Sequence, residues 1–431
     1  MKNKKQKLEL IAPAGSLDKM RTAFAFGADA VYLGIPDFSL RVRINEFTPK
    51  QIEKAILEAR EKKKKVYVTI NIFAHNRHLD ALPPYIKVLK DLGVDALIIS
   101  DPGVMSLVKK IWPKAKIHLS TQANCTNWSA AKFWQKQGVK RIVLGRETTL
   151  AEIKEIHKKC PTLELEYFIH GAMCMAYSGR CFLSKQFTGR SGNLGDCAQP
   201  CRWEYSLRET KVDGREMEIV EEEHGTYLLN SKDLCLIKHL DELAKAGVTS
   251  FKIEGRAKSV YYQAVVVNTY RQAIEKLSTL SSRAKSRDHI KFKAFTKNLY
   301  KELETKLVHR GYTTGFLLGG KADENKNNSH NKSDWEFCGV ALESPLLKGE
   351  AFMIHSSAFS TQVKVHNTIK VGDEIEIVRP NLPILKMKLA KMLNAKNGEE
   401  ITEAHGGGGG AIITIESQEE IPPLSVLRRR V

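Results

Sequence analysis

Five of the eight cysteines in this 431-residue chain fall within one short region. Cys174 and Cys181 lie in a glycine-rich turn directly after a strand-like run, and Cys197, Cys201 and Cys235 follow. In a reducing compartment, clustered thiols act as metal ligands or redox groups more often than as disulfides. The sequence therefore predicts a metal or redox site in this region.

The spacing of these cysteines favours an iron–sulfur cluster over zinc. Zinc sites usually pair thiols with two to four residues between them, and only Cys197 and Cys201 have that spacing. A ferredoxin-type run of closely spaced cysteines is missing as well. Wide gaps suit a cluster held by several loops at the mouth of a barrel, while zinc and free thiols stay open as alternatives. The other cysteines are expected to be small buried side chains: Cys125, Cys160 and Cys338.

Polar side chains at the ends of the predicted strands supply further candidates for a site. His170 and Glu254 are the candidate acid–base groups, although a turn residue and an ion pair explain them equally well. Arginine offers a fork of donors that matches carboxylate or phosphate oxygens. The candidate substrate-binding residues are Gln122, Arg146, Lys252 and Arg256.

A repeated pattern of helix, glycine and short apolar run organises the first 260 residues. A helix that ends at glycine and leads into a buried strand is the repeating unit of a parallel sheet. The pattern predicts eight strands alternating with helices, hence a (β/α)8 TIM-like barrel, with an open doubly wound sheet as the alternative. In such a barrel, functional groups gather where the strands end. The predicted strand segments are 8–13, 27–34, 65–73, 93–100, 116–121, 138–145, 163–169 and 247–255.

The pattern changes in the last quarter of the chain. We expect a catalytic domain over 1–320 with a Cys-rich insert at about 171–235, and a polar linker over 321–335. Short alternating strands then predict a small all-β barrel domain over 336–431.

Two predicted helices follow the Cys-rich insert. Ser231 is a good N-cap for a helix running toward Ala246, which would place Cys235 about one turn inside that helix. The apolar stripe of a second helix, 260–277, predicts packing on the outside of the barrel.

The charge of the chain favours a polyanionic partner. Lys and Arg total 68 against 49 Asp and Glu, a formal net charge of +19, which fits RNA, with a merely solvated basic surface as the alternative. Basic residues and aromatic rings also alternate over 185–215, as in surfaces that contact phosphates and stack on bases. That stretch contains Lys185, Phe187, Arg190, Arg202, Trp203, Tyr205, Arg208, Lys211 and Arg215.

Several other classes of protein find no support in the sequence. The basic N-terminus has no apolar signal core, and no run of about 18 apolar residues predicts a membrane span, so a cytoplasmic protein is expected. No HExxH helix, G-x-S-x-G elbow or phosphate-binding P-loop occurs.

The run EYFIHGAMCMAYSGRCFLS at 166–184 resembles the signature of the collagenase-like peptidase family of unknown catalytic type. The opening LIAPAGSLDKMRTAFAFGADAVYLG and the segments NSKDLCLIKHL, FKIEGR and RGYTTGF are similar to the same family. The resemblance covers nearly the whole chain, and it is greatest to the tRNA hydroxylation branch of the family.

This resemblance implies a protein that helps to form 5-hydroxyuridine at the wobble position of tRNA without oxygen. It implies a 4Fe–4S cluster, prephenate as the hydroxyl source, and tRNA and iron–sulfur delivery proteins as partners. The implied cluster ligands are Cys174, Cys181, Cys197 and Cys235, with Cys201 as the alternative. A collagenase-like peptidase and a non-catalytic RNA-binding or assembly protein remain the other hypotheses.

Overall fold

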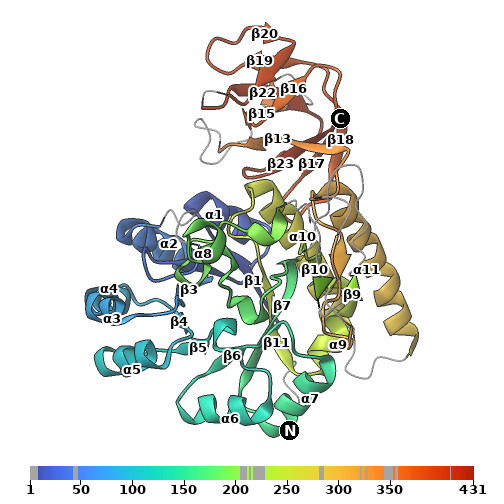
Figure 1. The fold of residues 1–431 in the computed structure, drawn as a ribbon. Helices are drawn as coiled ribbons and strands as arrows, with labels where there is room; N and C mark the ends of the chain where they lie inside the picture. Colours follow the sequence, from blue (N-terminus) through green and yellow to red (C-terminus); the bar gives the residue numbers. More distant parts are fainter. Residues whose placement is uncertain are drawn as a thin grey trace.

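The computed structural model describes residues 8–41, 47–203, 211–212, 215–216, 229–280, 286–320, 323–325, 329–343, 353–354, 358–407 and 409–431. Tyr205 and Arg208 of the predicted basic and aromatic stretch lie outside these residues. Two units follow one another along the chain, a barrel of parallel strands and an antiparallel sheet stacked at one end of it (Figure 1).

Eight parallel strands close the barrel, because the last of them pairs with both the first and the seventh. Each coincides with one of the eight segments predicted to form strands, although β7 runs three residues beyond its segment, so the predicted TIM-like barrel is confirmed. Nearly every barrel-strand residue is buried, as expected for parallel strands covered by helices. The strands are β1 (Glu9–Pro13), β2 (Ala30–Gly34), β3 (Lys65–Ile70), β4 (Ala96–Ile99), β5 (Ile117–Leu119), β6 (Arg141–Val143), β7 (Glu164–Ala172) and β11 (Val248–Ile253).

Helices surround the barrel and begin at side-chain caps. Ser16, Thr48 and Thr149 each accept a hydrogen bond from the backbone N–H three residues ahead, which satisfies a donor that the helix leaves unpaired. The predicted outer helix is confirmed by α10, which packs against β1 and α1. The helices are α1 (Leu17–Ala25), α2 (Pro49–Glu61), α3 (Asn76–Ala81), α4 (Pro83–Leu92), α5 (Pro102–Ile111), α6 (Trp128–Lys136), α7 (Leu150–Lys159), α8 (Leu183–Thr188), α9 (Leu240–Lys245), α10 (Val260–Thr279) and α11 (Ser286–Lys306).

The end of β7 extends beyond the barrel and pairs with an added strand. That strand, β10 (Asp233–Cys235), runs antiparallel to β7 and in turn pairs with β12 (Tyr312–Thr313). The prediction that Cys235 lies inside a helix is therefore wrong, since α9 begins only at Leu240. Gly171 permits the close approach here, because its φ is +109° and a Cβ would lie 2.4 Å from the carbonyl oxygen of Glu254.

The interior of the barrel contains a buried network of charges. The Lys252 Nζ lies 2.7 Å from Glu166 Oε1, and both side chains are buried. Arg141 bridges the Glu166 and Glu164 carboxylates, with N–O distances of 3.2 and 2.6 Å. Burial alone would raise the pKa of the Glu166 carboxyl, but the charges of Lys252 and Arg141 outweigh it and hold that pKa below its usual value. The network keeps Glu166 ionised beneath the barrel mouth.

The C-terminal unit is an antiparallel half-barrel with its own apolar core. The predicted C-terminal β domain is thus confirmed as a fold, while the predicted boundaries of the domains and of the linker stay predictions. The strands of the large sheet are β13 (Trp335–Ala341), β14 (Met353–Ile354), β15 (Ala358–Val365), β17 (Glu374–Val378), β18 (Leu385–Lys388), β19 (Met392–Asn394), β20 (Glu400–Ile401), β22 (Ile412–Ser417) and β23 (Val426–Arg430). In the same unit β16 (Thr368–Lys370) pairs with β21 (Glu403–His405), whereas β8 (Lys211–Val212) and β9 (Arg215–Glu216) form a separate pair that precedes β10 in the chain.

Contacts between the two units are apolar and ionic. Val378 and Val426 of the C-terminal sheet belong to the same apolar core as the barrel. The fully buried Arg428 forms ion pairs with Glu376 of its own sheet and with Glu302 of α11. In the part of the chain that the structure describes, no helix is long and apolar enough to cross a membrane.

Candidate active site at the barrel mouth

A cavity of about 500 Å³ opens where the barrel strands end. Its wall includes Asn71 after β3, Ser120 after β5 and Arg146 after β6. Lys252 and Glu254 enter it from the end of β11. The cavity therefore lies on the face of the barrel where a (β/α)8 fold collects functional groups.

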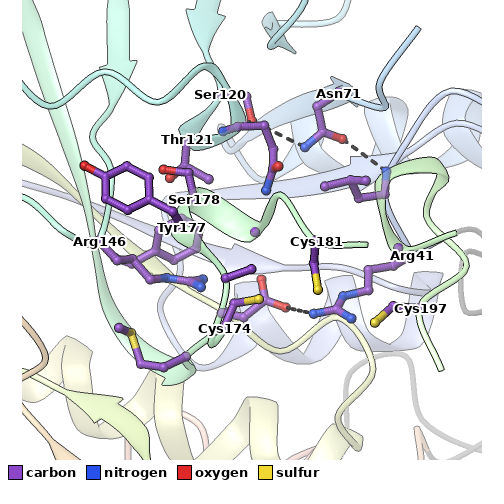
Figure 2. Close-up of a pocket in the computed structure, with 18 of the residues that line it drawn as sticks. Arg41, Asn71, Ser120, Thr121, Arg146, Cys174, Tyr177, Ser178, Cys181 and Cys197 are labelled. Atoms are coloured by element: carbon purple, nitrogen blue, oxygen red, sulfur yellow. Dashed lines mark hydrogen bonds and ion pairs between the residues drawn. The ribbon is translucent and has the colours of Figure 1, made fainter. Parts of the chain in front are cut away.

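Four cysteines line this cavity: Cys174, Cys181, Cys197 and Cys201. All four come from the segment that follows β7. Figure 2 shows Cys174 and Cys181 between Arg146 and Arg41, with Cys197 beyond the Arg41 guanidinium in this view. The sequence alone left open whether Cys197 or Cys201 is the third ligand, and the structure brings both into the cavity.

The cysteine segment is fixed to the loops that follow β5 and β6. The Ser178 hydroxyl donates to the Glu147 carboxylate at 3.2 Å, and Ser178 has a φ of +47° in a tight turn. The Arg180 guanidinium donates through Nε and Nη2 to the carbonyl oxygen of Gln122, at 3.1 and 2.7 Å. These contacts position the residues between Cys174 and Cys181 over the open end of the barrel.

Backbone N–H groups point at two of the thiols. The Leu183 N–H donates to Cys181 Sγ at 3.3 Å, and the Gln199 N–H donates to Cys197 Sγ at 3.4 Å. Hydrogen bonds to sulfur stabilise thiolate ligands and tune the potential of iron–sulfur clusters. The donor set and these hydrogen bonds therefore fit such a cluster.

The thiols do not form a closed ligand cage in the conformation shown. Within the described ranges, no three His, Cys, Asp or Glu side chains have the spacing of a metal site. Burial is the main cause that raises the pKa of the Cys201 thiol above its usual value. The fit to a cluster thus rests on four thiols facing one cavity and not on preformed ligand distances.

Two predicted site residues lie elsewhere. Cys235 is buried beside Tyr270, whose hydroxyl lies 3.7 Å from its Sγ, and burial raises the pKa of that thiol to about 11. His170 is its partner across β7 and β10 and contacts the same hydroxyl through Nδ1 at 3.3 Å. Neither residue lines the cavity. Both assignments, Cys235 as a cluster ligand and His170 as a catalytic group, therefore stay predictions that the cavity wall does not support.

Glu254 does face the cavity, surrounded by positive charge. Burial by itself raises the pKa of its carboxyl, but the charges of Arg41, Arg146 and Arg256 lower it more strongly. The Tyr32 hydroxyl donates to Glu254 Oε2 at 3.0 Å, and Glu254 Oε1 lies 4.0 Å from Arg41 Nη2. An ionised carboxylate with one oxygen toward the cavity can accept a proton from a bound substrate.

Two of the predicted substrate-binding arginines retain unused donors. Arg256 is buried, and its Nε and Nη1 have no hydrogen-bond partner among the described residues. Arg146 lies over the ring of Phe168 at 4.0 Å and forms no side-chain ion pair within the described part of the chain. The Arg256 Nη2 donates to the carbonyl oxygen of Leu40, but its buried, unpaired Nε and Nη1 are costly, so an oxyanion from a ligand fits this position.

The other two predicted substrate-binding residues also line the cavity. Lys252 is held by Glu166 and lies over the Tyr32 ring at 4.4 Å. Gln122 presents a buried side-chain oxygen without a partner in the described residues. Both are placed to contact a ligand, and Lys252 contributes positive charge beneath it.

Sequence reasoning missed two residues of the site. Tyr32 lies within an apolar strand run, where no motif identifies its hydroxyl as part of a site. Its position near the end of β2 is only a weak signal that it faces the cavity. Arg41 comes from a loop without a motif and has a φ of +72°. Only the three-dimensional placement of that loop brings Arg41 to the cavity.

The model of peptidase family U32 matches residues 15–327, and the model of the C-terminal domain of that family matches residues 352–428. Tyr32, Arg41, the four cavity cysteines and the residues at the end of β11 all lie within the first match. The two matches together cover most of the barrel and of the C-terminal sheet.

Three curated relatives illustrate the range of names in this group. A "tRNA hydroxylation protein P" from Escherichia coli is 41% identical and covers 93% of this chain and 92% of its own length. The "23S rRNA 5-hydroxycytidine C2501 synthase" of the same organism is 33% identical, covering 87% of this chain and 56% of itself. A "Collagenase" from Porphyromonas gingivalis is 28% identical over 98% of this chain and 97% of its own length.

Proposed function

The chain belongs to peptidase family U32, and from this premise we propose that it hydroxylates RNA, with the wobble uridine of a tRNA as the target base. The relatives named for tRNA hydroxylation and for rRNA 5-hydroxycytidine synthesis support this reaction class. The excess of Lys and Arg over Asp and Glu supports an RNA substrate. The product proposed is 5-hydroxyuridine.

The observation that carries the proposal is the set of four cysteines around one cavity at the barrel mouth. Cys174, Cys181, Cys197 and Cys201 would hold a 4Fe–4S cluster, and bound there it would supply one-electron redox chemistry next to the target base. Proteins that deliver iron–sulfur clusters are then expected partners.

The residues opposite the thiols suit a small carboxylate co-substrate. Arg256 and Arg146 both offer donors that no described residue uses, and each can donate to a carboxylate oxygen. Prephenate carries two carboxylates, so as hydroxyl source it would match two separate guanidinium groups. Gln122 would accept a hydrogen bond from the co-substrate or from the uracil ring.

Glu254 is proposed as the catalytic residue, because it faces the cavity. Its lowered pKa leaves it ionised, and the Tyr32 hydroxyl fixes one carboxylate oxygen. The other oxygen would take a proton from the substrate, while Lys252 stabilises negative charge that develops nearby. The closed floor of the barrel beneath Lys252 limits the access of water.

Mass spectrometry of tRNA nucleosides from a strain lacking this gene tests the proposal. We expect hydroxyuridine-type nucleosides to disappear, to return with the wild-type gene or with Cys235→Ser, and not to return with Cys201→Ser. Unchanged nucleosides in the deletion strain would reject the RNA-modification function.

The collagenase-named relative supports one other function, a peptidase. Among the described residues of the cavity wall there is no histidine to activate a serine or cysteine, and His170 is buried elsewhere. Cleavage of collagen by purified protein, abolished by substitution of a residue of the cavity, would establish that alternative.

A further inference from the structure

The segment that carries the four cysteines also exposes large aromatic rings. Phe182 is 81% exposed, Tyr177 and Phe187 are each 54% exposed, and Trp203 is 42% exposed. Among the other described Phe, Tyr and Trp residues only Phe133, at 54%, is exposed to this degree, and Trp128 follows at 37%. Large rings gathered in solvent mark a binding surface, because burial in a partner stabilises them. We call Tyr177, Phe182, Phe187 and Trp203 the aromatic rim.

The aromatic rim lies next to the cavity. Tyr177 lines the cavity itself, and Phe182 and Trp203 are within two residues of the cavity cysteines Cys181 and Cys201. The rings of Phe187 and Trp203 contact each other, with centroids 6.4 Å apart. A partner that covers the aromatic rim is therefore in position to place one of its groups among the thiols.

The side chains around the aromatic rim are mostly basic, which favours an anionic partner. Four basic side chains and one acidic side chain, Asp196, occur between residues 173 and 203. Arg180, Lys185 and Arg202 donate only to neutral oxygens, those of Gln122, Gly189 and Gln199, and none has a carboxylate partner in the described ranges. Among the described residues these three cations are therefore placed to approach the phosphates of a partner.

A surface on which aromatic rings alternate with basic side chains is suited to bind single-stranded nucleic acid. Bases stack on exposed rings, and phosphates approach the cations between them. A duplex does not match, because its bases are already stacked and paired. A cavity of about 500 Å³ has the size of a site for one small ligand and not for a helix.

We infer that the aromatic rim stacks on the unpaired nucleotides that flank the target, so that one unstacked nucleotide enters the cavity. This inference rests on the proposed function and names the structural class of its substrate, an RNA loop with splayed bases. Recognition by stacking tolerates different bases at the flanking positions, whereas the cavity selects the base that enters it.

Binding of a fluorescent single-stranded oligouridylate to the anaerobically purified full-length protein tests this inference. We expect Phe182→Ala and Phe187→Ala each to weaken binding by about 5- to 150-fold, the loss of one base–ring stack. Phe133→Ala is the matched control, because Phe133 is as exposed as Phe187 but lies on α6, and it should change binding by less than about 2-fold. Circular dichroism and iron content verify that each variant is folded and loaded.

Two further probes separate stacking from charge. An abasic strand of the same length keeps the phosphates, so wild type and Phe182→Ala should bind it equally. A duplex of equal length should bind weakly and show no effect of the variants. If Phe182→Ala and Phe187→Ala bind oligouridylate as Phe133→Ala does, or lose affinity for the abasic strand to the same extent, the inference is overturned.

The same data keep the two proposals apart. Ring-dependent binding of single strands together with unchanged tRNA nucleosides in the deletion strain would reject the hydroxylation function and leave the aromatic rim standing. Lost nucleosides together with ring-independent binding would reject the aromatic rim alone and favour a protein partner for these rings.

Discussion

Replacing Glu166 by Gln should destabilise the barrel strongly, because it removes the counter-charge of a buried lysine. Lys252 lies 2.7 Å from Glu166, and both side chains are almost completely buried. Removing one partner of a buried ion pair costs about 3–5 kcal/mol, since the remaining charge has neither water nor a counter-ion. At roughly 2–4 °C per kcal/mol, the melting temperature should fall by at least about 6 °C.

The double variant Glu166→Leu with Lys252→Met separates charge from packing. It removes both charges, while Arg141 keeps its ion pairs with Glu9 and Glu164. Apolar replacement of a buried pair is often neutral or stabilising, so the double variant should melt near the wild-type temperature, yet lack activity because Lys252 lines the cavity. Thermal unfolding followed by circular dichroism measures both variants. A Glu166→Gln protein as stable as wild type, or a double variant as unstable as Glu166→Gln, would refute the reasoning.

Three shorter predictions concern residues around the cavity. Burial lowers the pKa of His170 to about 3. Below about pH 6.5 the unfolded chain therefore binds a proton at this histidine that the folded chain does not bind. The free energy of unfolding should fall by about 1.4 kcal/mol per pH unit from roughly pH 6 down to pH 4. Urea unfolding across that range should show a shallower slope for His170→Leu, and an equal slope would contradict the buried neutral imidazole. Gly171→Ala should lower the free energy of unfolding by about 1–3 kcal/mol or more, because the φ of Gly171 is +109° and the added Cβ would meet the Glu254 backbone. Gly189→Ala should lower it less in the same unfolding assay, because no atom lies within 4 Å of the Cβ that would be added there. Arg256→Lys should raise the KM for the carboxylate co-substrate at least about 10-fold, since an ammonium cannot replace the fork; an unchanged KM in steady-state assays of tRNA hydroxylation would count against a carboxylate at Arg256.

The barrel could be predicted because its signal is local. Four of the strands, β2, β4, β6 and β11, follow a helix and a glycine, and the other four are short apolar runs that alternate with helical patterns. β10 could not be predicted in the same way. Its three residues form a strand because the extended end of β7 offers an edge some 60 residues earlier in the chain, whereas the local pattern after Ser231 favours a helix.

The site was predictable as a cysteine-rich cluster but not in its membership. Spacing along the chain does not tell whether a thiol faces the cavity or the core, and this is what distinguishes Cys201 from Cys235. His170 looked available for catalysis because it follows a strand, yet the pairing of β7 with β10 buries it beside Tyr270. Long-range packing decides both cases.

Iron and acid-labile sulfide analysis of anaerobically purified protein tests the central claim most directly, with Cys201→Ser and Cys235→Ser as the matched pair. The account predicts about four irons and four sulfides per wild-type chain, as in a 4Fe–4S cluster. Cys201→Ser should lose most of both, whereas Cys235→Ser should keep them, because Cys201 lines the cavity and Cys235 is buried beside Tyr270. Wild-type protein without iron, or loss of iron from Cys235→Ser but not from Cys201→Ser, would contradict the account.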